Sequence, residues 1–229
     1  SFASMAVVPS RQVVPIPDTV SFEIGALLGC GVTTGLGAVT NITDVGSGET
    51  VAVFGCGGVG AGAILAADAV SAGMIIAVDL DSETLTTMDE IGATQTINAS
   101  TADPVAEIRE LTGGVDYAFE CIGTPQTVQQ AIASLGPGAT AVITGTSSTP
   151  PAEIDLGQFT KGITVTGNIV GFTQPSVDIP KYARMYENGD LDLDAILTAR
   201  YELHELADAF DALAAGNGIR SVVRFDEGA

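Results

Sequence analysis

A glycine-rich string at residues 55–60, GCGGVG, has a spacing suited to holding phosphate groups. Gly55, Gly57 and Gly60 satisfy the pattern G-x-G-x-x-G. In such a loop the first glycine permits a tight turn from a strand into a helix, the second lets the backbone approach a pyrophosphate, and the third lets the helix pack on the strand. Free N–H groups at the start of the helix would then face the phosphates. We therefore expect these glycines, together with Gly58, to bind a dinucleotide.

The residues around this string support that interpretation. The apolar run Val51–Phe54 predicts a strand before the loop, and a helical pattern opens at Val59. A second predicted strand, Ile75–Val78, is followed by Asp79, about 20 residues beyond the loop, where a carboxylate can accept hydrogen bonds from the adenosine ribose. The residues that follow Asp79 add negative charge and include no arginine to balance a 2′-phosphate. The pattern therefore predicts that NAD binds in preference to NADP. A tight turn in an unrelated α/β fold, including a methyltransferase-type fold with a similar glycine loop, is the alternative.

Strand and helix signals alternate regularly along the middle of the chain. The remaining strands of this region are expected at residues 94–97, 115–119 and 139–144, and its helices at 59–72, 82–91, 103–111 and 125–135. Continuous apolar strands separated by amphipathic helices are typical of a parallel sheet covered on both faces. Because crossovers between parallel strands are right-handed, the predicted fold class is α/β with a doubly wound parallel sheet, the Rossmann fold.

The flanking regions have a looser pattern. Helices are expected from Ser21, near 180–188 and at 203–215, with a second short helix at 32–42, a strand at the sheet's edge over 163–170 and a final strand at 221–225. We divide the chain into a linking segment, 1–45, a dinucleotide-binding domain, 46–175, and C-terminal helices with a final strand, 176–229.

The charge balance excludes several classes of partner. Of the 229 residues, 28 are acidic and 8 are basic, which gives a net charge of -20. Such a surface repels phosphate backbones and anionic membranes, so we expect neither a nucleic acid nor a membrane as partner. The acidity is either an ordinary solvated surface or an adaptation to concentrated salt, where screening relieves self-repulsion. No apolar run approaches the roughly 20 residues needed to span a bilayer, and the first residues lack a signal-peptide pattern, so we expect a cytoplasmic protein.

Cysteine and histidine are scarce. Cys30, Cys56 and Cys121 are far apart in the sequence and odd in number, which argues against a disulfide framework. His204 is the single histidine and cannot by itself build a zinc site or a Ser-His-Asp triad. A self-contained metallohydrolase or serine hydrolase is therefore a poor interpretation.

Five stretches together resemble the zinc-dependent alcohol dehydrogenases of the medium-chain dehydrogenase/reductase family. They are GCGVTTGLGAV at residues 29–39, AVFGCGGVG at 52–60, AVDLD at 77–81, GGVDYAFECIG at 113–123 and GIRSVVRF at 218–225. Their order and spacing match the family along nearly the whole chain.

The resemblance implies roles for individual residues. Cys30 falls where the family places a ligand of its catalytic zinc, and Thr34 and Val59 would pack against the nicotinamide ring, Thr34 as the residue nearest the chemistry. Asp79 would hold the adenosine ribose, and Arg220 matches an arginine that contacts the pyrophosphate. The residues implied to line the cofactor cleft are Ile122, Thr144 and Gly145.

The same resemblance implies an enzyme that transfers a hydride between an alcohol or aldehyde and NAD with catalytic zinc, as a homodimer or homotetramer. The remaining zinc ligands would belong to a separate catalytic domain that also takes in the N- and C-terminal segments of this chain, so we expect this chain alone to be inactive. Two alternatives stay open: a zinc-free quinone or enoyl reductase of the same superfamily, which Cys30 disfavours, and a non-catalytic module that senses NAD.

Overall fold

The computed structural model describes residues 2–3, 5–146 and 151–225. Two compact units are present: one is Cys30–Thr173, and the other combines residues 1–29 with residues 174–229. We describe each unit by itself.

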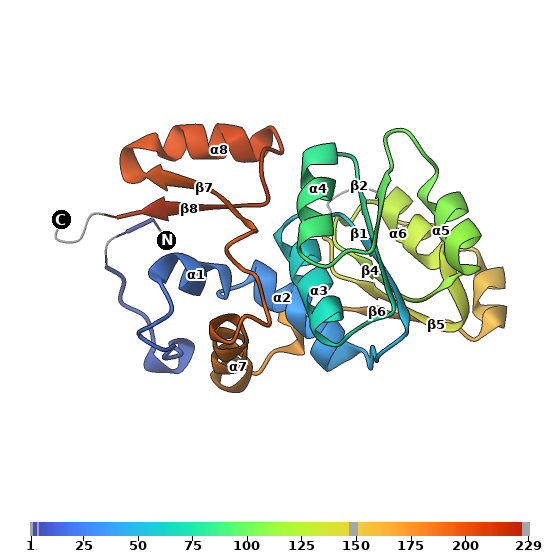
Figure 1. Cartoon of the computed structure of the whole chain (residues 1–229), viewed down its shortest axis with the longest axis horizontal. Coiled ribbons are helices and arrows are strands. Elements are labelled where there is room, and N and C mark those ends of the chain that lie inside the picture. Colours follow the sequence, from blue (N-terminus) through green and yellow to red (C-terminus); the bar gives the residue numbers. More distant parts are fainter. Residues whose placement is uncertain (1, 4, 147–150, 226–229) are drawn as a thin grey trace. The chain divides into compact units, whose positions relative to one another are not determined.

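The larger unit is built on a six-stranded sheet in the order β3-β2-β1-β4-β5-β6, in which all neighbouring strands are parallel (Figure 1). Its strands are β1 (Thr50–Phe54), β2 (Met74–Asp79), β3 (Gln95–Asn98), β4 (Val115–Glu120), β5 (Leu135–Ile143) and β6 (Thr164–Gly167). The strand order reverses between β1 and β4, which is the topological switch point of a doubly wound fold. The predicted fold class is confirmed.

Helices cover both faces of this sheet. They are α2 (Gly31–Gly37), α3 (Gly58–Ala69), α4 (Ser82–Glu90), α5 (Pro104–Thr112) and α6 (Pro125–Ala133), with the π-helical η2 (Ala38–Ile42) and the short 3-10 turns η3 (Leu156–Lys161) and η4 (Val170–Phe172). Figure 1 shows α3 and α4 on one side of the sheet and α5 and α6 on the other. Because η2 continues α2, the helix predicted over residues 32–42 is confirmed as one continuous segment.

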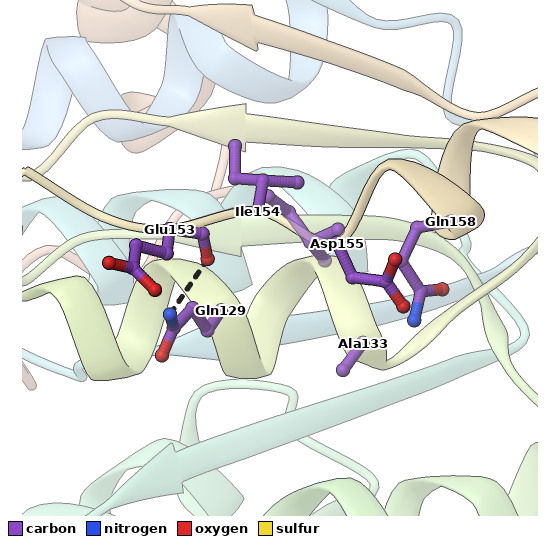
Figure 2. Close-up of a pocket in the computed structure, with 7 residues that line it drawn as sticks. Gln129, Ala133, Glu153, Ile154, Asp155 and Gln158 are labelled. Carbon is purple, nitrogen blue, oxygen red and sulfur yellow. Dashed lines mark hydrogen bonds between the residues drawn. The ribbon is translucent and has the colours of Figure 1, made fainter.

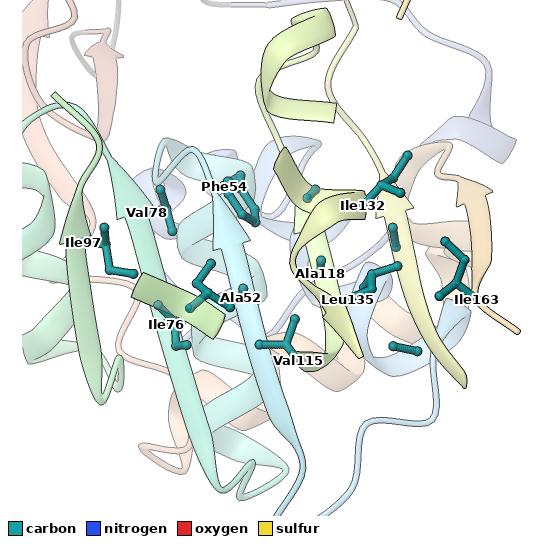
Figure 3. Packing of buried hydrophobic residues seen from close by; sticks show 14 residues of the cluster. Ala52, Phe54, Ile76, Val78, Ile97, Val115, Ala118, Ile132, Leu135 and Ile163 are labelled. Carbon is teal, nitrogen blue, oxygen red and sulfur yellow. The ribbon is translucent and has the colours of Figure 1, made fainter. Parts of the chain in front are cut away.

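The core beneath α5 and α6 is formed by alternate residues of the strands. Ala52 and Phe54 of β1 lie on the same face as Ile76 and Val78 of β2, and Ile132 of α6 packs into this cluster (Figure 3). The intervening strand residues are buried on the opposite face. Since both faces are covered, each central strand must be apolar throughout, and this produces the continuous apolar runs of the sequence.

Local signals determine where several helices begin. Asp81, Asp103 and Thr124 accept hydrogen bonds from the first-turn amides of α4, α5 and α6, as N-cap residues do. Gly113 ends α5 in the left-handed conformation with φ 76°. These caps explain why the helix starts read from the sequence agree closely with the structure.

The smaller unit pairs helices with a two-stranded parallel sheet. Its elements are η1 (Ser10–Gln12), α1 (Phe22–Leu27), α7 (Pro175–Glu187), β7 (Leu197–Glu202), η5 (Leu203–Glu205), α8 (Leu206–Ala214) and β8 (Arg220–Arg224). Ser21 caps α1, as predicted. Glu23 of α1 accepts a hydrogen bond from Arg200 of β7 at 2.8 Å and forms an ion pair with Arg224 of β8 at 3.2 Å, so one carboxylate ties the helix to both strands.

Four boundaries differ from the sequence-based expectation. Helix α6 ends at Ala133, and β5 already begins at Leu135, whereas the sequence predicted a helix to 135 and a strand only from 139. The predicted strand 163–170 is shorter, because left-handed backbone follows its end. Helix α7 begins at Pro175 and keeps Pro180 inside it, and β7 was not predicted.

Only one of these differences follows a local preference. Pro175 lies in the first turn of α7, where its missing N–H has no partner within the helix in any case, whereas Pro180 lies inside the helix and removes a backbone hydrogen bond there. The sequence Gly136-Pro137-Gly138 is typical of a turn. In the structure these residues instead continue β5, and the pairing of β5 with β4 shifts register there. The strand pairing overrides the local preference there.

The predicted division at residues 45/46 and 175/176 stays a prediction. The structure adds that residues 30–45 pack with the rest of the larger unit, because α2 lies against α3 without intervening side chains. A Cβ at Gly35 would lie 2.0 Å from the carbonyl oxygen of Val59, and a Cβ at Gly62 would lie 2.6 Å from that of Val32. In the part of the chain that the structure describes, no helix is long and apolar enough to cross a membrane.

Candidate dinucleotide site

Three loops meet at the carboxyl ends of the central strands of the larger unit. They follow β1, β4 and β5, which are consecutive in the sheet order, and they carry most of the residues singled out by the sequence. Ligands of open α/β sheets bind in the crevice at this edge, where the strand order reverses. The arrangement therefore places the glycine loop and the predicted cleft residues at one site.

Two glycines of the loop after β1 are required by close contacts. Gly55 adopts φ 88°, and a Cβ there would lie 2.4 Å from Cγ1 of Ile122 in the loop after β4. A Cβ at Gly60 would lie 1.9 Å from the carbonyl oxygen of Gly55 and 3.2 Å from Cγ1 of Val53. Any side chain at either position would push α3 or the neighbouring loop away.

Gly57 is different, because nothing lies within 4 Å of the position a Cβ would occupy. Its φ of -68° is open to any residue, so packing and backbone strain do not require glycine here. Gly57 is the N-cap of α3 and offers no capping side chain, and the first amides of a helix have no partner within it. Exposed backbone, open space and a helix N-terminus together fit an anionic group such as a pyrophosphate.

Asp79 lies at the end of β2, beside this loop. Its Oδ2 accepts a hydrogen bond from the amide of Cys56 at 2.7 Å, and its Oδ1 accepts from the amides of Leu80 at 2.7 Å and Asp81 at 3.1 Å. The carboxylate is therefore held directly against the glycine loop. It remains half-buried, which suits a group that meets the hydroxyls of a ligand at the rim of the site.

Glu120 organises the loops after β4 and β5. The residue is fully buried, and its Oε1 accepts from the amides of Ile122 at 2.9 Å and Gly123 at 2.7 Å and from the hydroxyl of Thr127 at 2.7 Å. Its carbonyl oxygen accepts from the amides of Thr144 at 2.8 Å and Gly145 at 3.1 Å. The three residues predicted to line the cleft, Ile122, Thr144 and Gly145, are thus brought together around one buried residue.

Thr34 and Cys30 lie at the start of α2, in the same unit. The Thr34 hydroxyl donates to the carbonyl oxygen of Cys30 at 2.8 Å, and its side chain is buried. Asn168, which follows β6, links the carbonyl oxygen of Thr34 to the hydroxyl of Thr144. Thr34 is therefore connected to the cleft residues of β5, whereas Cys30 is exposed.

The other two thiols are poor metal ligands and nucleophiles. Burial raises the pKa of the Cys56 thiol, and the charge of Asp79 raises it further. Burial likewise raises the pKa of the Cys121 thiol, with the neighbouring Glu120 adding to the effect. Both groups stay protonated at neutral pH, while a metal ligand must be a thiolate.

The donor set does not make a zinc site. Within the described ranges, no group of three or more histidine, cysteine, aspartate or glutamate side chains could hold a metal ion. A catalytic zinc needs three protein ligands and an open position, and Cys30 supplies at most one of them. The residues therefore fit a dinucleotide but not, by themselves, a zinc ion.

Arg220 begins β8 in the smaller unit, so its predicted contact with a pyrophosphate stays a prediction.

A pocket of about 220 Å³ beside α6 contains none of the predicted residues. Figure 2 shows its lining, where the Gln129 amide donates to the carbonyl oxygen of Glu153 at 2.7 Å and Asp155 and Gln158 face the same hollow. Its size is below that of ordinary ligand sites.

Sequence reasoning missed Glu120 and Asn168. Glu120 has a detectable signal, since an acidic residue directly after the apolar pair Ala118-Phe119 must find donors when it is buried. Asn168 has none, because its partners Thr34 and Thr144 are 134 and 24 residues away in the sequence.

Comparison with known proteins agrees with this geometry. Residues 58–188 match the model of the zinc-binding dehydrogenase family. Alcohol dehydrogenase-like 5 of Arabidopsis thaliana is 35% identical over 229 residues, which cover 97% of this chain and 59% of the relative. S-(hydroxymethyl)glutathione dehydrogenase of Komagataella pastoris is 32% identical over 97% of this chain and 61% of its own length.

Solved structures lead to the same conclusion. Benzyl alcohol dehydrogenase from Acinetobacter calcoaceticus superposes with a TM-score of 0.90 at 31% identity, covering 93% of this chain and 59% of that one. A zinc-binding-domain alcohol dehydrogenase from Burkholderia ambifaria gives 0.90 at 34% identity, over 93% of this chain and 58% of that one. The chain belongs to the zinc-binding dehydrogenase family, as the resemblance predicted. It spans about 60% of the length of these relatives.

The contrast between Gly57 and Gly60 gives a direct test of the phosphate site. In Gly57→Ala the new methyl group meets no protein atom, so the free energy of unfolding should change by less than about 0.5 kcal/mol. The same methyl group occupies the space a pyrophosphate needs, so the Kd for NAD, measured by calorimetry, should rise at least about tenfold.

Gly60→Ala is the matched variant. Its methyl group would collide with the carbonyl oxygen of Gly55, so this change should lower the free energy of unfolding by about 1–3 kcal/mol in a denaturant titration. Unchanged NAD affinity in Gly57→Ala would place the phosphates elsewhere.

Proposed function

We propose that this chain is the cofactor-binding portion of an NAD-dependent alcohol dehydrogenase of the zinc type. The observation that carries the proposal is the junction of β1, β2 and β4, where an open glycine loop at a helix N-terminus lies against the carboxylate of Asp79. The relatives named above, which include dehydrogenases of benzyl alcohol and of S-(hydroxymethyl)glutathione by name, support an alcohol or aldehyde as substrate.

Each residue has a defined task in this proposal. The backbone of Gly57 and Gly58 and the N-terminus of α3 bind the pyrophosphate, with Arg220 contributing a positive charge. Asp79 accepts hydrogen bonds from the adenosine ribose hydroxyls. The cleft residues that orient the nicotinamide ring and exclude water beside it are Thr34, Val59, Ile122, Thr144 and Gly145.

The bound nicotinamide supplies the chemistry by exchanging a hydride with the carbon that bears the alcohol oxygen. The role of the protein is to hold the ring in a single orientation within a dry cleft. In the zinc-type enzyme Cys30 would provide one metal ligand, and the others would come from residues outside this chain. The same incomplete donor set supports our proposal that the chain alone does not oxidise alcohols.

Cofactor preference tests this function, since Asp79 should favour NAD over NADP. A 2′-phosphate at the ribose would lie beside this carboxylate, and two like charges about 4 Å apart repel by roughly 4 kcal/mol at an effective dielectric constant of about 20. Screening reduces this repulsion, so calorimetry should show NAD binding about tenfold to a thousandfold more tightly, about 1.4 to 4 kcal/mol.

Asp79→Asn keeps one oxygen as an acceptor but removes the charge, and it should reduce the preference to less than about tenfold. Asp81→Asn is the matched control, because Asp81 caps α4 through Thr84 and asparagine also caps helices well. It should reduce the preference less than Asp79→Asn does, because the carboxylate of Asp81 is directed at the start of α4. Equal affinities for NAD and NADP in the unmodified chain would show that Asp79 does not meet the ribose.

We also propose a homodimer, or a homotetramer built from it, formed through β6. This strand is at the edge of the sheet, and an edge strand pairs readily with a second copy about a twofold axis. The Asn168 amide donates to the carbonyl oxygen of Ile143 in β5, so strand alternation points the amide of Val165 away from β5. Val165→Pro therefore removes an outward donor and should give a monomer by light scattering.

The control for this dimer is Thr96→Pro on the opposite edge strand, β3. The Ala99 amide donates to Asp79, so the Thr96 amide likewise points outward, and the variant should keep the oligomeric state. A monomeric unmodified chain at high protein concentration contradicts the proposed interface.

We further propose that the acidic surface reflects adaptation to concentrated salt within a cytoplasm. A net charge of -20 produces repulsion between the acidic side chains. This repulsion extends over about 10 Å in 0.1 M salt but only about 3 Å in 1 M salt. The melting temperature should therefore rise steeply between dilute and molar KCl. A flat or falling curve in a thermal-melt series would rule out this role.

A further inference from the structure

Asn168 stands at the point where β6 ends and the chain turns back toward α2. Its amide still belongs to the sheet, since it donates to the carbonyl oxygen of Ile143 at 3.0 Å. The next residues leave the strand and form η4, whose Gly171 is buried against α2. The position of the Asn168 backbone is therefore determined by the sheet, while its half-buried side chain reaches out of it.

The side chain makes three hydrogen bonds to three different elements. Its Nδ2 donates to the carbonyl oxygen of Thr34 in α2 at 3.3 Å and to Oγ1 of Thr144 after β5 at 2.9 Å. Its Oδ1 accepts from the amide of Gly171 at 2.7 Å. A backbone amide can only donate, so this last bond determines which end of the side chain is oxygen and which is nitrogen.

The segment after Asn168 has a backbone that needs such support. Val170, Gly171 and Phe172 have φ values of 50°, 66° and 47°, which is the left-handed region. For valine and phenylalanine this conformation is unfavourable and persists only where the surroundings hold it. The bond from Asn168 to the Gly171 amide acts at the middle residue of the three.

The same segment is packed against α2 without side chains between them. A Cβ at Gly37 would lie 2.4 Å from the carbonyl oxygen of Gly171, and a Cβ at Gly171 would lie 2.8 Å from that of Thr33. Asn41 also donates to the carbonyl oxygen of Gly171 at 3.1 Å. Helix α2, η4 and the end of β6 therefore form one rigid assembly.

The contact with Thr144 has a chemical consequence. The Nδ2 of Asn168 occupies the acceptor side of this hydroxyl, so the proton of Thr144 is directed elsewhere. No bond from this hydroxyl to another described residue is present, so we expect its proton to be offered to a ligand. Asn168 thus sets the direction of the hydrogen bond that Thr144 offers and, at the same time, the position of Thr34.

We propose that Asn168 is a positioning residue for the nicotinamide half of the cofactor. The inference rests on the proposed function, because Thr34 and Thr144 are placed at the nicotinamide end there. The side-chain hydrogen bonds of Asn168 within the described residues go to Thr34, Thr144 and Gly171, and not to the glycine loop or Asp79, which are proposed to serve the adenosine and pyrophosphate end. Its loss should therefore affect one half of the ligand and not the other.

ADP-ribose tests this separation, because it carries every part of NAD except the nicotinamide ring. In the unmodified chain both ligands should bind in calorimetry. In Asn168→Ala the Kd for NAD should rise about tenfold or more, about 1.4 kcal/mol, while the Kd for ADP-ribose changes less than about twofold. General loosening of the unit would weaken both ligands equally, so equal losses would overturn the proposal.

Asn41→Ala is the matched control, because it removes the other asparagine bond to Gly171 without touching Thr34 or Thr144. It should leave both affinities unchanged, and a loss of NAD affinity equal to that of Asn168→Ala would overturn the proposal.

Asn168→Asp, which retains an acceptor for the Gly171 amide but loses the donor, covers the case in which the alanine variant does not fold. It should show the same selective loss of NAD affinity, and unchanged NAD affinity in a folded Asn168→Asp would overturn the inference. If the unmodified chain binds neither ligand, the proposed function itself fails.

Discussion

The rest of the site depends on close contacts of two glycines at the carboxyl ends of β1 and β4. Gly55 lies against Ile122, and Gly60 lies against Gly55, at separations that leave no room for a Cβ. These contacts determine how closely α3 can approach the sheet and where the loop after β4 can run. The N-terminus of α3 and the residues predicted to line the cleft consequently lie at the same edge of the sheet, where ligands of open α/β sheets bind.

Glu120 shows how this arrangement is stabilised from within. Burying a carboxylate is unfavourable unless donors surround it, and its Oε1 receives two loop amides and a hydroxyl from the first turn of α6. Its Oε2 has no hydrogen-bond partner in the part of the chain that the structure describes. The bonds that satisfy Oε1 are the bonds that shape the loop, so moving Ile122 and Gly123 would leave a second oxygen of this buried carboxylate without donors.

The two ends of the site are built in different ways. The end proposed for the phosphates and the ribose comes from the single stretch Thr50–Asp79, in which a strand, a loop, a helix and the next strand follow one another. The opposite end is assembled from Thr34, Ile122, Thr144 and Asn168, which lie on four separate elements and meet only through the sheet order. Hydrogen bonds between distant residues therefore matter most at the end proposed for the nicotinamide.

The sequence by itself determined the fold class and the positions of the glycine loop and Asp79 at the ends of two neighbouring strands. Apolar runs, caps such as Asp103 and fixed glycine spacing act over short distances along the chain, and their meaning does not depend on what lies opposite. The tertiary structure alone decided that Leu135 extends β5, that Pro180 lies inside α7, and that Asn168 joins Thr34 to Thr144. In those places the preference of the local sequence is weak or opposed, and contacts between residues far apart in the chain outweigh it.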